Sequence, residues 1–197
     1  MKRASILFVI LAASALAQTT APVPGHDHSA PNPALSGLKK ELIEGITEND
    51  FIKLGDKPQT VKITLVAVFT DANYGMNFNG YAKGSAIYTI PKGWTVEVTY
   101  INPSPIPHSV IVIERADTRK LQVPAPYFKG GAIPNHLQGL AYNKAVFSFV
   151  ADEVGEYAIA CGFPAHAMNG HWLALDVDEK IKVPTLKLGD GPVTEAK

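Results

Sequence analysis

Apolar and polar residues alternate with a period of two through most of the chain between residues 60 and 177. In the clearest stretch, positions 94, 96, 98 and 100 are apolar while 95, 97 and 99 are polar, which is typical of a half-buried strand. The same reasoning predicts further strands at 61–69, 85–90, 108–113, 145–150, 156–161 and 171–177. Seven short strands separated by turn signals predict an all-β, antiparallel sandwich.

Two stretches depart from this pattern. Residues 115–143 carry three prolines and a Gly-Gly pair, but their large apolar residues favour a structured excursion over disorder. Residues 38–60 form an N-terminal extension, with a short helix expected between 38 and 51. We expect one domain at 61–184, a frayed tail at 185–197, and neither an internal repeat nor a second domain.

The N-terminus has the features of a secretory leader. Lys2 and Arg3 precede an apolar run, and Ala15-Leu16-Ala17 matches a small-x-small cleavage site before Gln18. Residues 1–17 are therefore predicted to be a signal peptide, with an uncleaved N-terminal anchor as the alternative. Residues 18–37, rich in Pro and Ala, are predicted to be a flexible linker. This organisation implies export to the periplasm or the outer face of the cell membrane.

Charge excludes one class of partner. The chain has 18 basic and 18 acidic residues, and loss of the leader would leave 16 basic against 18 acidic ones. This near-neutral balance argues against binding to nucleic acid by charge. Because no segment after the leader is long and apolar enough to cross a bilayer, we expect peripheral membrane contact or none. We also expect a monomer.

The chain has a single cysteine, Cys161, so an internal disulfide is impossible. In an exported protein such a residue is an inter-chain partner, a reactive thiol or a metal ligand. His166 and His171 follow it at intervals of five residues in a short loop between two predicted strands, and His108 begins another apolar strand. A tight loop between rigid strands can direct a thiolate and several imidazoles to one point.

Strand parity supports a buried site. Tyr157, Ile159 and Cys161 share one apolar strand face, and His171 shares a face with Leu173, so Cys161 and His171 should both point inward. A thiolate with two imidazoles is the trigonal ligand set of a blue-copper site, which a weak axial ligand completes.

Several short segments of the sequence resemble those of a known family. The matching segments are Asn77-Phe78-Asn79-Gly80, Ile90 to Trp94, Asn102 with Pro107-His108-Ser109-Val110, and the loop from Cys161 to Trp172. Residues 61–177 thus resemble the cupredoxins, and within them the sulfocyanin and rusticyanin branch. The resemblance implies a Greek-key β-sandwich of about seven or eight strands. It also implies one copper ion that carries single electrons between redox partner proteins, without catalytic residues.

The resemblance also assigns roles. His108, Cys161 and His166 would bind copper, and the residues expected to support them are Ser109, Asn102, Gly162 and Pro164. Ser109 should hydrogen-bond towards the Cys161 strand. The branch places an axial Met five residues after the loop histidine, where this chain has His171. We favour His171 as the axial ligand, with Met168 as the fallback, and an imidazole there predicts a lower reduction potential.

Other functions stay open on the sequence. A site with three imidazoles could leave room for water and act as a small copper enzyme on nitric oxide or reactive oxygen species. A copper storage or delivery protein would use His26 and His28 as a weak extra metal site. The set of His108, Cys161, His166 and His171 also suits tetrahedral zinc.

Overall fold

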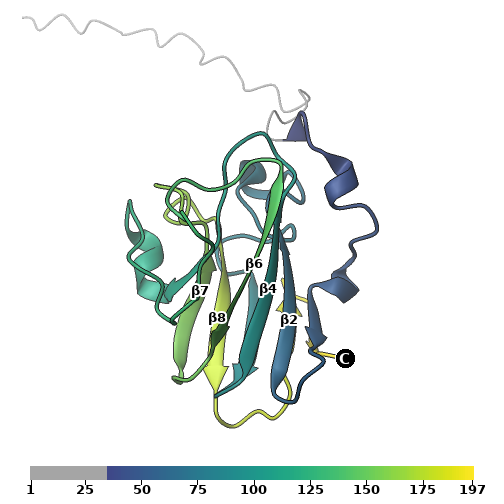
Figure 1. The fold of residues 1–197 in the computed structure, drawn as a ribbon, viewed down its shortest axis with the longest axis vertical. Coiled ribbons are helices and arrows are strands. Elements are labelled where there is room, and N and C mark those ends of the chain that lie inside the picture. The colour runs from purple at the N-terminus through teal and green to yellow at the C-terminus, as the bar shows by residue number, and fades with distance from the viewer. Residues whose placement is uncertain (1–34) are drawn as a thin grey trace, which may run out of the picture. The chain divides into compact units, whose positions relative to one another are not determined.

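The computed structural model describes residues 35–197, so the predicted leader, most of the linker, His26 and His28 lie outside the described residues. The first sheet has the strand order β1-β2-β4-β6 (Figure 1). Its strands are β1 (Ile52–Leu54), β2 (Thr60–Val66), β4 (Thr95–Asn102) and β6 (Asn143–Val150). β2 and β4 are parallel, whereas the other two pairs are antiparallel.

The second sheet has the order β10-β9-β3-β8-β7-β5. Its strands are β3 (Ala86–Pro91), β5 (Ile111–Glu114), β7 (Gly155–Ala160), β8 (Trp172–Asp178), β9 (Thr185–Leu188) and β10 (Val193–Glu195). β3 and β8 are parallel, and the remaining neighbours are antiparallel. The predicted all-β sandwich is therefore confirmed, but it is mixed rather than purely antiparallel.

The core lies between the two sheets, where the alternating apolar positions meet. Val96, Val98 and Tyr100 of β4 face Tyr157, Ile159 and the neighbouring inward residues of the second sheet, and all are buried. A smaller apolar cluster covers the outer face of the second sheet, where Ile111 and Ala160 pack beneath Val123 of the excursion. Residues 115–143 are thus an ordered cover, as predicted.

Three further expectations differ from the structure. The tail after Pro184, expected to be frayed, forms β9 and β10, because β9 pairs with the edge of β3 and β10 pairs with β9. The strand expected at 108–113 is shorter, and His108 forms only an isolated bridge with Leu140. The helix expected at 38–51 is two 3₁₀ turns, η2 (Lys40–Leu42) and η3 (Glu48–Asp50).

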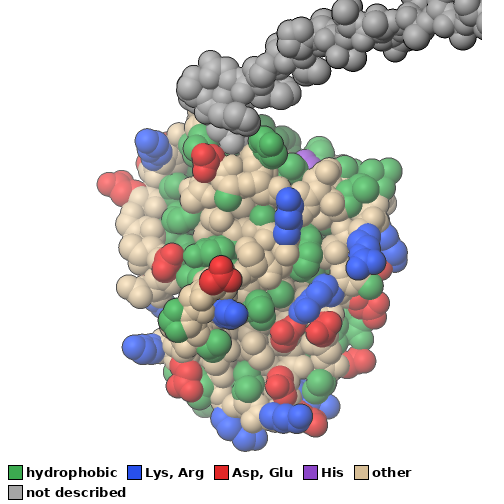
Figure 2. All heavy atoms as spheres, turned by 180° about the vertical axis from the view of Figure 1, so that it is seen from behind, with side chains coloured by type: hydrophobic (Ala, Val, Ile, Leu, Met, Phe, Trp, Pro, Cys, Tyr) green, Lys and Arg blue, Asp and Glu red, His purple; other side chains and the backbone are tan. Residues whose placement is uncertain are grey.

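Two more 3₁₀ turns, η4 (Ala72–Gly75) and η5 (Arg115–Arg119), lie in the connections. Among the described residues, no helix has the length and apolar character needed to span a membrane. On the face seen in Figure 2, basic and acidic side chains are interspersed, in keeping with the balanced charge of the sequence.

Candidate metal centre

The loop between β7 and β8 is closed by its own backbone. The N–H of Cys161 donates to the carbonyl of His171 at 2.9 Å, and the N–H of His171 donates to the carbonyl of His166 at 3.0 Å. Cys161 and His171 therefore stand opposite each other where the two antiparallel strands meet the loop. Both side chains point into the sandwich, as strand parity predicted, and each is fully buried.

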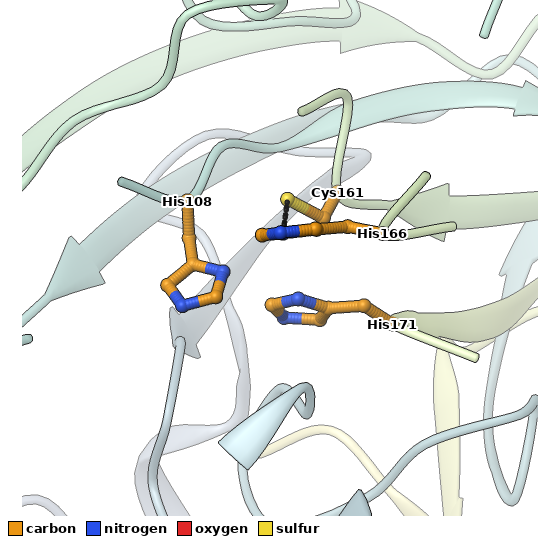
Figure 3. A group of neighbouring side chains, drawn as sticks. All are labelled: His108, Cys161, His166 and His171. Carbon is orange, nitrogen blue, oxygen red and sulfur yellow. Dashed lines mark hydrogen bonds between the residues drawn. The ribbon is translucent and has the colours of Figure 1, made fainter. Parts of the chain in front are cut away.

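Four side chains converge at this point (Figure 3). One ligand atom from each of His108, Cys161, His166 and His171 can be chosen so that all four atoms lie within 4.8 Å of one another. Sγ of Cys161 lies 3.4 Å from Nδ1 of His166. The ring centroid of His108 lies 5.0 Å from that of His166 and 4.9 Å from that of His171. Two segments of the chain, one at His108 and one running from Cys161 to His171, thus direct four donor atoms to one small volume.

Burial determines the protonation of these groups. Desolvation lowers the pKa of His108 to about 3, with a smaller contribution from the nearby His166. Burial, and then the neighbouring His108 and His166, hold the pKa of His171 well below its usual range, against a weaker opposing effect of the Asn77 backbone. Burial likewise lowers the pKa of His166. The three imidazoles are therefore neutral, which is the form that binds metals.

The sulfur is also affected by burial. Desolvation raises the pKa of the Cys161 thiol to about 11, although hydrogen bonding from the backbones of Ser109 and Phe163 and from the Ser109 side chain opposes the shift. Without a cation the group is thus a thiol, and binding of a metal ion requires loss of its proton.

A metal ion fits this arrangement. Among the described residues, Nδ1 of His108 and both ring nitrogens of His171 are buried without a hydrogen-bond partner, although buried polar atoms are normally satisfied. Lone pairs on neutral imidazole nitrogens, aimed at a common volume with a sulfur, are the donors that copper and zinc prefer. A bound cation would satisfy one of these nitrogens on each ring.

Ser109 joins the His108 segment to the Cys161 loop. Its N–H donates to Sγ of Cys161 at 3.3 Å, and its Oγ accepts from the N–H of Gly162 at 2.8 Å. Gly162 leaves no room for a side chain, since a Cβ there would lie 2.9 Å from the carbonyl oxygen of His136 and 3.2 Å from Oγ of Ser109. Of the four residues named from the sequence as supports, Ser109 and Gly162 therefore join the two segments of the site through these contacts.

The other predicted positions differ in their surroundings. Asn102 is buried, and its Nδ2 donates to the carbonyls of Ile106 and Leu140, which fixes the turn before His108. Pro164 is exposed on the loop. Met168 is 50 % exposed on the loop, whereas His171 is fully buried and belongs to the converging group.

Sequence reasoning missed the backbone contacts that hold the loop from outside. The N–H of Ala165 donates to the carbonyl of Leu121 at 2.7 Å, and His108 exchanges two backbone hydrogen bonds with Leu140. On the other side, Nδ2 of Asn73 donates to the carbonyl of Asn169 at 3.0 Å. Carbonyl groups carry no residue-specific signal, so only the run of apolar residues in 115–143 indicated that this segment packs on the protein.

Phe78 forms the wall behind His171. Its ring centroid lies 4.3 Å from that of His171 and 6.3 Å from that of Tyr100. On either side of it, Nδ2 of Asn77 donates to the carbonyl of Thr70 in the preceding loop, and Oδ1 of Asn79 accepts from the N–H of Val66 in β2 at 2.7 Å. The Asn-Phe-Asn-Gly motif quoted from the sequence therefore holds an aromatic ring against the site.

A β-sandwich with one thiolate and several imidazoles buried between a strand end and a loop defines a cupredoxin, a class of protein whose cofactor is a single copper ion that carries electrons. The model of the sulfocyanin (SoxE) domain matches residues 49–187. The chain belongs to the sulfocyanin family.

Relatives agree with this assignment in sequence. The chain is 28 % identical to the sulfocyanin of Sulfolobus acidocaldarius over 137 residues, which are 64 % of this chain and 67 % of that protein. Solved structures with similarity include rusticyanin from Thiobacillus ferrooxidans, with a TM-score of 0.44 and 19 % identity over 66 % of this chain and 89 % of that one. Another is dithionite-reduced auracyanin from Roseiflexus castenholzii, with a TM-score of 0.42 and 20 % identity over 59 % and 96 % of the two chains.

Proposed function

We propose that this chain is an exported carrier of single electrons in which His108, Cys161 and His166 bind copper and His171 is the axial ligand. The observation that carries the proposal is the convergence of the four donor atoms on one small volume. Three of the four side chains, those of His108, Cys161 and His171, are no more than 3 % exposed. When bound there, copper supplies a one-electron couple between its two oxidation states. Because the donors are fixed by strands and by a closed loop, they need to move little when the charge of the site changes.

The burial of the ligands favours a carrier over an enzyme. Cys161, His108 and His171 are buried, and only His166 is partly open to solvent. A substrate such as nitric oxide would need an open coordination position, whereas an electron needs only a short path to the surface, and the His166 edge provides one. A redox partner protein is proposed to dock at this end. Ile106, Leu121 and Met168, which are 45 %, 66 % and 50 % exposed, supply apolar contact area beside the loop.

Export is part of the proposal and rests on the leader-like sequence of residues 1–17. A location outside the cytoplasm would place the site beside membrane-bound electron donors and acceptors. Mass spectrometry of the protein purified from its native cells tests this: an N-terminus at Gln18 is expected, and an N-terminus at Met1 would favour the anchor.

The first experiment is a Cu²⁺ titration of the mature protein, followed by its visible absorption. An intense thiolate-to-copper band that saturates at one equivalent is expected. In His171→Met the band should shift and the reduction potential should rise, because a thioether binds copper more weakly than an imidazole does. Met168→Leu is the matched control and should leave the spectrum unchanged. No band in the unaltered protein would refute the ligand set, and a spectrum altered by azide would favour the open site of an enzyme.

A further inference from the structure

Tyr100 is a buried tyrosine whose hydroxyl has no partner. It lies on β4 in the core, it is fully buried, and its hydroxyl forms no hydrogen bond with any described residue. Such a group is unusual because a buried hydroxyl loses its bonds to water and normally regains them in the protein. An unpaired hydroxyl in this core therefore calls for an explanation in terms of what lies near it.

The surroundings of Tyr100 lead to the metal centre. Its ring packs edge-on against Phe78 at 6.3 Å and 78°, and Phe78 in turn lies 4.3 Å from His171. Tyr100 and Cys161 belong to the same buried core cluster, and after the larger effect of burial the charge of Cys161 raises the pKa of Tyr100 further. The hydroxyl thus lies in the same dry part of the core as the sulfur and the buried imidazole.

We propose that Tyr100 is a positioning residue of the copper centre, and that the dipole of its hydroxyl stabilises negative charge on the Cys161 sulfur. The proposal rests on the proposed ligand set. A hydroxyl hydrogen turns towards the best available acceptor, and among the described residues no acceptor, the sulfur included, lies within hydrogen-bond distance to fix this one. In a core of low dielectric constant, the dipole would turn its positive end towards the thiolate that Cys161 would become on binding a metal, because Cys161 is the charged group that acts on Tyr100.

This arrangement has a definite sign. Reduction of the site makes it more negative by one unit, so a dipole with its positive end towards the site favours the reduced state. The positive end of the dipole also lowers the energy of the sulfur electrons, so the thiolate-to-copper transition needs more energy. The same dryness argues against a tyrosyl radical as an electron relay, because no described group lies close enough to accept the phenolic proton.

Tyr88 provides a matched control. It is also fully buried, but its hydroxyl has partners: Nδ2 of Asn79 donates to it at 3.3 Å, and it donates to the carbonyl of Phe51 at 3.4 Å. Cys161 is not among the groups that shift the pKa of Tyr88. Tyr88→Phe and Tyr100→Phe therefore delete the same atom from the same core, once with partners and once without.

The test compares the two variants with the unaltered protein, both loaded with Cu²⁺ and metal-free. In Tyr100→Phe we expect the thiolate-to-copper band to move to longer wavelength, the reduction potential to fall, and the metal-free protein to melt at the same or a higher temperature. In Tyr88→Phe we expect a lower melting temperature and an unmoved band. A band and potential that do not move in Tyr100→Phe, or that move equally in both variants, would overturn the proposal. Absence of the band in the unaltered protein would overturn the ligand set and this proposal together.

Discussion

Ser109 holds the Cys161 loop through two different atoms: its N–H donates to the sulfur at 3.3 Å, and its Oγ accepts from the next residue of the loop at 2.8 Å. The backbone contact is independent of the residue type, but the side-chain contact is not. The hydroxyl therefore fixes the loop and adds a longer contact of 3.8 Å to the sulfur, whereas the amide makes the shorter contact with the sulfur. These two roles can be separated by substitution.

Ser109→Ala is expected to lower the free energy of unfolding of the metal-free protein by about 1–3 kcal/mol, because the N–H of Gly162 is left buried without an acceptor. The thiolate-to-copper band should persist with a small shift, since the amide contact to sulfur remains. Denaturant unfolding and visible spectroscopy measure the two effects.

The control for this change is Thr118→Val, which deletes a hydroxyl that donates to the carbonyl of Arg115 at 2.8 Å in η5. It should cost stability without any spectral shift. Equal spectra for Ser109→Ala and the unaltered protein, together with unchanged stability, would contradict the role given to the hydroxyl.

Gly162→Ala is expected to destabilise the protein by about 1–3 kcal/mol and to alter the copper spectrum, because the new Cβ would press on the His136 carbonyl and on Oγ of Ser109. The pressure acts on the contact between the excursion and the loop, so the position of the sulfur should change. Denaturant unfolding and the visible spectrum of the copper-loaded protein test this.

Gly93→Ala is the matched control for the loss of stability. Gly93 has a φ of 85° and open space around its α-carbon, so an Ala there meets only backbone strain of roughly 1–2 kcal/mol. Gly93 lies beyond the end of β4 that is opposite Asn102, and its substitution should leave the spectrum unchanged. An unaltered spectrum in both variants would show that the Gly162 contact does not position the sulfur.

The sequence carried strong signals for the strands and for the converging residues. Period-two patterns predicted seven of the ten strands that the described residues form, and strand parity predicted that Cys161 and His171 point inward, because side chains in a strand alternate strictly between its two faces. The spacing of Cys161, His166 and His171 in one short loop limited how far apart they could lie. Only the pairing with His108 required knowledge of which strands are neighbours.

Other features have no sequence signature of comparable strength. β9 has only four residues, Thr185–Leu188, and it exists because the free edge of β3 supplies hydrogen bonds to a short segment of weak intrinsic preference. The contact of Leu121 with the loop uses a backbone carbonyl, which every residue has. The unpaired hydroxyl of Tyr100 depends on what its neighbours fail to offer, and that is a property of packing alone.

Acid should weaken the N-terminal extension selectively. The Lys53 side chain, and then the backbone and side chain of Thr47, lower the pKa of Asp50 to about 2. A carboxyl group with a lowered pKa stabilises the fold above its unfolded pKa of roughly 4, and this contribution is lost as the pH falls from there towards 2. Asp50→Ala should therefore reduce stability at pH 6 and have little effect at pH 2, as measured by thermal unfolding at both values. An equal loss at both pH values would contradict the assignment.

The turn at η4 stores backbone strain beside the site. Asn73 and Tyr74 have φ values of 50° and 58°, and Gly75 follows at 84°, so three consecutive residues are left-handed. Asn tolerates this conformation and uses its side chain to bind the carbonyl of Asn169, but Tyr74 is 80 % exposed, and its conformation costs roughly 1–2 kcal/mol.

Tyr74→Asn is therefore expected to raise the free energy of unfolding by about 0.5–1 kcal/mol, since Asn adopts a positive φ more readily than Tyr does. Denaturant unfolding measures this gain, and the copper spectrum should stay unchanged because the Asn73 contact remains. Asn73→Ala is the companion variant: it removes the side chain that binds the metal loop and should lose stability. If Tyr74→Asn proved less stable than the unaltered protein, the exposed ring would have to stabilise the turn by more than the strain costs.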